Sequence, residues 1–225
     1  MNETLIQIAT WLVPLIIAIV FHEVAHGLVA RRLGDPTAAQ LGRLTLNPFK
    51  HVDPVGTVIL PMVLALAKAP IFGWAKPVPV VAERLRNPRR DMVIVALAGP
   101  AMNFLLAFVA VLILLAVDAG SAQRGGATFF IAQNAVNFLL INLFLATFNL
   151  IPLPPFDGGH VVEGFLPRRA VPAWRNFGRF AIIILFALLL VVPMIVPSAN
   201  VVERLISPIV MRIAEFYLGL AGIAS

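Results

Sequence analysis

The sequence predicts an all-α polytopic membrane protein with five or six hydrophobic segments, one of them re-entrant, and short membrane-associated β-strands. Hydrophobic residues make up 60% of the 225 residues and charged residues only 12%, against about 25% in ordinary soluble domains. The net charge of +6 comes from Lys and Arg residues in short stretches between apolar runs, a positive-inside pattern rather than a nucleic-acid surface. We therefore expect contact with the lipid bilayer and no nucleic-acid partner.

The first apolar segment runs from about Thr4 to Ala30 and ends at Arg31 and Arg32. Basic residues mark the cytoplasmic ends of membrane spans, so this segment should enter from outside. Polar residues near its end should then lie within the membrane, toward the cytoplasmic side.

Short elements are expected before the next crossing. The alternation from Gln40 to Leu46 favours a strand, and Pro77 and Pro79 favour a second extended ribbon over Lys76–Val80. The segment Val55–Ala67 is broken by Pro61 and is too short for an easy crossing, so it is interpreted as re-entrant.

The second half of the sequence contains further hydrophobic segments. Met92–Val117 and Phe129–Leu150 are long enough to cross, and Phe180–Val196 is expected to cross as well. The last segment, Val201–Ile223, carries charges of both signs and either crosses or lies in the interface.

The run FHEVAHG at residues 21–27 contains an H-E-x-x-H motif inside the first apolar segment. Histidines four apart lie on one helix face, so His22 and His26 are positioned to bind one zinc ion, with Glu23 as a general base. Only about 0.002 chance matches are expected for this composition. The alternative, two packed histidines beside a buried glutamate, is costly in an apolar span.

A catalytic zinc usually has three protein ligands and an open position. The chain has no cysteine, which leaves His, Asp and Glu as ligands. Asp157 is the best candidate because it follows a proline-rich helix end on the same inner side as His26. We expect His51 to be structural, and a direct role for His160 stays open.

Four stretches together resemble the site-2 protease family of intramembrane zinc metalloproteases. They are residues 21–27, residues 47–57 (NPFKHVDPVGT), residues 72–80 (FGWAKPVPV) and residues 149–159 (NLIPLPPFDGG). The resemblance implies that His22, His26 and Asp157 bind one Zn²⁺ and that Asn149 holds substrate or polarises the scissile carbonyl. The sequence departs from the family in showing no PDZ or nucleotide-sensing domain, so we expect a compact form of it.

The resulting expectation is a single domain over residues 1–225, with a catalytic core at about 4–164 and C-terminal helices at about 178–223. It would hydrolyse peptide bonds in or near transmembrane segments of membrane proteins, in the plasma membrane and toward the cytoplasmic side. The alternative is a zinc-binding membrane protein for transport or partner recognition. Glu23 favours the protease, because neither alternative role requires a general base beside the metal.

Overall fold

Among the residues that the structure describes, three helices are long and apolar enough to cross a membrane. The computed structural model describes residues 3–66, 73–117, 126–195, 202–220 and 222. Within them, α1 (Glu3–Arg32) contains the apolar span Thr10–Arg32, and α4 (Pro88–Ala116) and α5 (Ala127–Asn149) each contain an apolar stretch long enough to cross. These helices correspond to three of the predicted hydrophobic segments.

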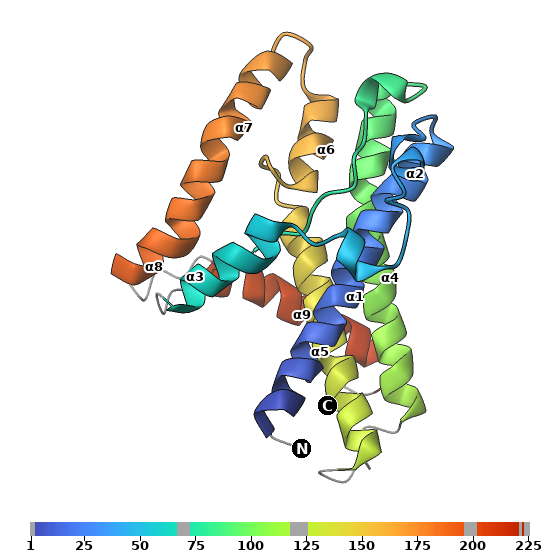
Figure 1. Cartoon of the computed structure of the whole chain (residues 1–225), viewed down its shortest axis with the longest axis vertical. Coiled ribbons are helices and arrows are strands. Elements are labelled where there is room, and N and C mark those ends of the chain that lie inside the picture. The colour runs from blue at the N-terminus through green and yellow to red at the C-terminus, as the bar shows by residue number, and fades with distance from the viewer. Residues whose placement is uncertain (1–2, 67–72, 118–125, 196–201, 221, 223–225) are drawn as a thin grey trace.

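These three helices pack on one another and run along the long axis of the molecule (Figure 1). Small buried residues such as Ala107, Ala110 and Ala146 line the contacts of α4 and α5, and small residues allow helix backbones to approach closely in lipid. The short helix α9 (Ser207–Leu220) packs against α5, and Tyr217 Oη donates to Phe104 O at 3.3 Å. The helical core therefore holds α1 firmly against α4.

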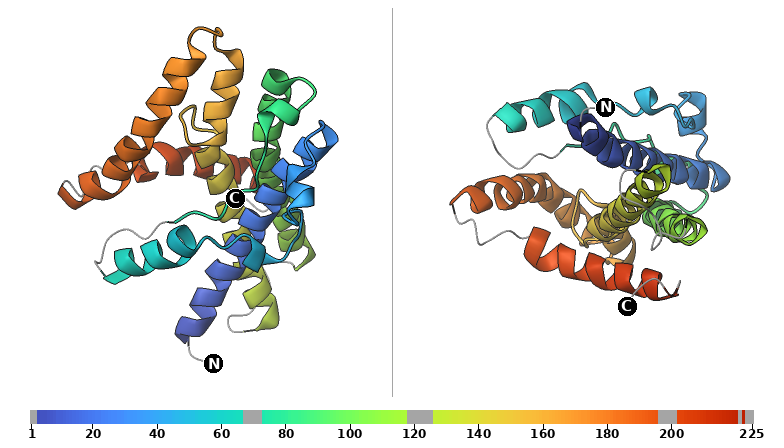
Figure 2. Two further views of the ribbon diagram at one scale, coloured as in Figure 1. Left: turned by 45° about the horizontal axis from the view of Figure 1, so that its top comes forward. Right: turned by 90° about the horizontal axis from the view of Figure 1, so that it is seen from below.

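Shorter elements surround this core (Figure 2). The α-helices are α2 (Thr37–Gln40), α3 (Leu60–Leu66), α6 (Asp157–Phe165), α7 (Val171–Phe186) and α8 (Val192–Ile195). Tighter or wider helical turns cover Pro48–Lys50, Pro54–Ile59, Ala82–Arg84, Ala187–Val191 and Val202–Ile206. The segment interpreted as re-entrant is thus helical from Pro54 to Leu66, and its last residue, 67, lies outside the described residues. So do residues 196, 201, 221 and 223 of the predicted C-terminal segments.

The strand prediction is wrong: the described ranges contain no β-strand. Between Gln40 and Leu46 the alternation is interrupted by Gly42, whose φ of +63° turns the chain out of an extended path. The backbone N–H of Arg43 then donates to Ala38 O at 2.8 Å and closes a turn after α2.

The predicted ribbon over Lys76–Val80 also forms no strand. We call residues 73–81 the proline segment. Pro77 and Pro79 have no N–H and cannot donate to a strand ladder. The N–H between them, that of Val78, is bound by a side chain of α1 instead.

Candidate metal centre

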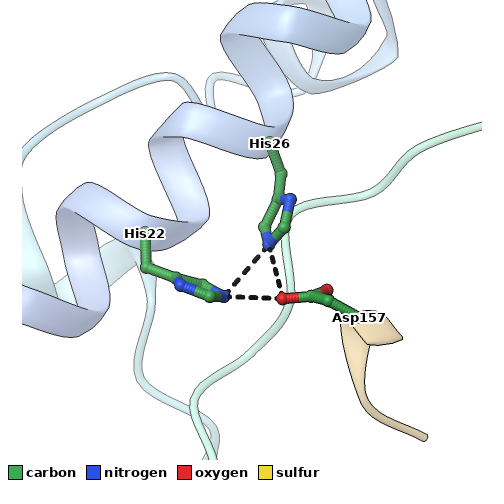
Figure 3. Close-up of side chains that lie close together, drawn as sticks. All are labelled: His22, His26 and Asp157. Carbon is green, nitrogen blue, oxygen red and sulfur yellow. Dashed lines mark hydrogen bonds and ion pairs between the residues drawn. The ribbon is translucent and has the colours of Figure 1, made fainter. Parts of the chain in front are cut away.

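Two elements far apart in the sequence meet at the candidate site. His22 and His26 lie one turn apart on the same face of α1, and Asp157 is the first residue of α6 (Figure 3). The prolines after α5 stop that helix, and the first turn of α6 packs against residues 150 and 151 just after it. Gly158 permits this approach, because a Cβ there would overlap the carbonyl oxygens of Leu150 and Ile151. The turn thereby places the Asp157 carboxylate beside the histidine rings.

The three side chains converge through one atom each. His22 Nε2 and His26 Nε2 are 3.0 Å apart, and Asp157 Oδ2 lies 3.2 Å from the former and 3.4 Å from the latter. The histidines are buried, with 7% and 9% of their surface exposed. This is the one group of three or more His, Cys, Asp or Glu residues in the described structure that lies close enough to hold a metal ion.

Backbone and side-chain acceptors on α4 fix the protons on the outer sides of the rings. His26 Nδ1 lies 2.7 Å from Val95 O, and because a carbonyl only accepts, Nδ1 must carry the proton. His22 Nδ1 lies 2.6 Å from Asn103 Oδ1. The assignment of the Asn103 amide is supported by its Nδ2, which donates to Ala18 O at 3.3 Å and to Asn142 Oδ1 at 2.8 Å.

In the neutral rings, both inward-facing Nε2 atoms are therefore lone-pair acceptors. They face each other and Asp157 Oδ2, which is buried without a hydrogen-bond donor among the described residues. Three converging acceptors repel one another unless a cation lies between them. Two imidazoles and a carboxylate suit zinc and leave a fourth coordination position open.

The opposite wall of the site is the bare backbone of α4 at Gly99. A Cβ at this position would overlap His26 Nε2 and the ring of His22. The glycine therefore keeps open the space into which both Nε2 atoms point.

Comparison with known proteins identifies the family. The profile of peptidase family M50 matches residues 10–137 and 120–192, and so includes all three converging residues. The chain belongs to peptidase family M50. No solved structure matches it at a significant level.

The curated relatives of this M50 peptidase have provisional names as zinc metalloproteases. YwhC of Bacillus subtilis is 37% identical over 178 residues, covering 77% of this chain and 78% of YwhC. Rip2 of Mycolicibacterium smegmatis is 30% identical over 185 residues, covering 80% of this chain and 66% of Rip2. MJ0611 of Methanocaldococcus jannaschii is 31% identical over 144 residues, covering 64% of each chain. Together with the apolar helices, these matches identify an integral membrane zinc metalloprotease whose cofactor is Zn²⁺.

The other candidate residues of the M50 peptidase have different surroundings. Glu23 Oε2 accepts a hydrogen bond from Val78 N–H at 2.7 Å. Asn149 ends α5 and donates to Leu145 O of its own helix at 3.0 Å, and no hydrogen bond in the described structure joins it to the three converging residues. His51 is buried, and its Nε2 lies 2.9 Å from Thr45 O, whereas His160 is exposed on α6.

Sequence reasoning missed Asn103 and the backbone partners Val95 O and Val78 N–H. A polar residue in an apolar span was the available signal for Asn103, since such residues are rarely placed there without a partner. Backbone groups carry no residue-type signal, so the other two partners emerge only from the packing of α4 and the proline segment on α1.

Proposed function

We propose that this M50 peptidase hydrolyses peptide bonds in or near transmembrane segments of membrane proteins, with one Zn²⁺ held by His22, His26 and Asp157. The observation that supports this most is the convergence of three buried acceptors, two of them on a helix apolar enough to span a membrane. Bound zinc would polarise the scissile carbonyl and make water at the site more acidic.

The side chains of the chain would supply the remaining steps. Glu23, next to His22 on α1, accepts the proton of the attacking water and later passes it to the leaving amine. Asn149 is assigned to the substrate, where its amide would steady the developing oxyanion. This requires the amide to leave Leu145 O when substrate binds.

We further propose that residues 1–225 form one domain, with the catalytic core at about 4–164 and C-terminal helices at about 178–223. The helical stretch Pro54–Leu66 would be re-entrant, which is supported by its short length. Together with the three long helices, this stretch and the shorter C-terminal helices would make up the five or six hydrophobic segments. The protein would lie in the plasma membrane with its site toward the cytoplasm, because Arg31 and Arg32 follow the zinc motif.

The test is cleavage of model single-span membrane proteins by the purified enzyme in liposomes. Glu23→Gln should keep one zinc per chain and lower the cleavage rate by about 10²–10⁴-fold, the usual contribution of a general base. Mass spectrometry of the products should locate the cut within or beside the apolar segment. Undiminished cleavage by Glu23→Gln would refute the assigned role.

A further inference from the structure

The proline segment lies against the face of α1 that carries Glu23 and Gly27. Val78 N–H donates to Glu23 Oε2 at 2.7 Å. The Val78 side chain is buried and lies over Gly27, where a Cβ would come within 2.8 Å of Val78 Cγ1. Glu23 and Gly27 are four residues apart and share a helix face. One residue of the segment thus contacts α1 through both its backbone and its side chain.

Two further side chains hold the segment on either side of this contact. Arg43 Nη2 donates to Lys76 O at 2.8 Å and to Pro77 O at 3.4 Å. Asp35 Oδ2 accepts from Val81 N–H at 2.6 Å. Arg43 is 8% exposed, and none of the carboxylates in the described ranges forms a salt bridge with it. A buried guanidinium is therefore used to hold two backbone carbonyls.

These outer contacts involve neither Glu23 nor the metal ligands. They fix the path of the segment independently, so the Val78 N–H is oriented before any reaction begins. Pro77 and Pro79 have no N–H, which makes Val78 the one backbone donor at three successive positions. The single N–H of Val78 holds one of the two carboxylate oxygens of Glu23, which leaves the other oxygen to accept a proton.

We propose that the proline segment is a positioning element for Glu23, with Val78 N–H holding Oε2 so that Oε1 faces the attacking water. This rests on the proposed function, because it requires Glu23 to be the proton acceptor. It gives residues 73–80, the described part of the FGWAKPVPV stretch, a role in the reaction. Arg43 and Asp35 act through the segment and are positioning residues as well.

The contact itself is tested by hydrogen exchange, without any activity measurement. Between Pro77 and Pro79 the only exchangeable backbone amide is that of Val78. It should exchange slowly in the wild type and in Glu23→Gln, whose side-chain carbonyl still accepts. In Glu23→Leu it should exchange at least tenfold faster. Equal exchange in Glu23→Leu and the wild type would overturn the proposal.

The consequence for catalysis is tested by removing only the donor. Val78→Pro deletes the N–H, and replacing Val78 by its α-hydroxy acid does so without adding a ring, which guards against a misfolded proline variant. The matched control is the α-hydroxy acid of Ala170, which deletes the hydrogen bond of Ala170 N–H to Pro167 O at 2.8 Å, outside the proline segment.

An α-hydroxy acid replaces the backbone amide by an ester, so we call this variant the Val78 ester. It has lost a hydrogen bond to a charged group, which should lower kcat roughly 10-fold to 100-fold. KM and zinc content should stay at wild-type values, and the Ala170 ester should keep kcat within about twofold. Equal kcat in the two esters, or loss of zinc from the Val78 ester, would overturn the proposal. The proposed function is judged separately by Glu23→Gln, so the two failures are distinguishable.

Discussion

His22 and His26 are held from outside the site by different kinds of acceptor. His26 uses the backbone carbonyl of Val95, which no substitution removes, whereas His22 uses the side chain of Asn103. Asn103 is in turn held by Ala18 O and by Asn142 of α5. Such outer partners fix the ring and its tautomer. Of the two histidines proposed to bind zinc, His22 is therefore the one whose hydrogen-bond partner can be removed by a substitution that leaves the proposed ligands unchanged.

Asn103→Leu should lower zinc affinity about 10-fold to 100-fold, the usual effect of losing an outer partner. Chelator competition on the purified protein measures this. The matched control is Asn137→Leu, because Asn137 is also buried and donates to α1, at Thr10 O, but forms no hydrogen bond with the site in the described structure. An equal loss of affinity in both variants would show that general loosening of the helices is responsible.

Gly99→Ala should abolish stable zinc binding, because its Cβ would overlap both histidine rings where their Nε2 atoms converge. Metal analysis after dialysis measures the result. Gly219→Ala is the control, since a Cβ there meets no atom within 4 Å. Full zinc occupancy in Gly99→Ala would place the metal elsewhere.

At the scale of elements, the sequence predicts those parts whose chemistry is carried by side chains. The zinc-motif helix and the Asp157 turn follow from residue spacing, and the structure places their side chains together. The strand prediction over Gln40–Leu46 is wrong because Gly42 turns the chain despite the alternation. The ribbon prediction over Lys76–Val80 is wrong because prolines favour extended backbone but also remove the N–H donors that a strand ladder needs. The partners Val95 O and Val78 N–H depend on how helices and loops pack, which no local pattern encodes.

The junction between α1 and the proline segment should depend on pH. Asp35 is fully buried, and burial alone would raise its pKa, but hydrogen bonds from Thr37 and Val81 and the nearby Arg84 lower its pKa below 3.8. A carboxyl group whose pKa is lower in the folded than in the unfolded state stabilises the fold at pH values above its unfolded-state pKa. This stabilisation is lost as the pH falls through the folded-state pKa.

Asp35→Asn should therefore lower the free energy of unfolding by about 1–3 kcal/mol at pH 7. The difference from the wild type should shrink once the pH falls below about 4. Thermal unfolding in detergent at a series of pH values measures both. A difference that is constant down to pH 3 would mean that the Asp35 charge is not what holds the junction.

At the scale of the whole molecule, the turn between α6 and α7 and the start of α5 lie at opposite ends of the long axis (Figure 1). The proposed orientation puts the basic α6–α7 end in the cytoplasm. The chain has no cysteine, so single cysteines report on each end. Arg169→Cys should be labelled from the cytoplasmic side and Gly126→Cys from outside. The reverse labelling would invert the orientation.

The central claim is that Asp157, brought by the turn after α5 to the histidines of α1, completes the zinc site. The most direct test is the zinc content and zinc affinity of purified Asp157→Ala beside the wild type. The wild type should hold one zinc per chain. Asp157→Ala should bind zinc at least 100-fold more weakly, because two imidazoles alone leave half of a tetrahedral site unfilled. One tightly bound zinc of unchanged affinity in Asp157→Ala would contradict the account.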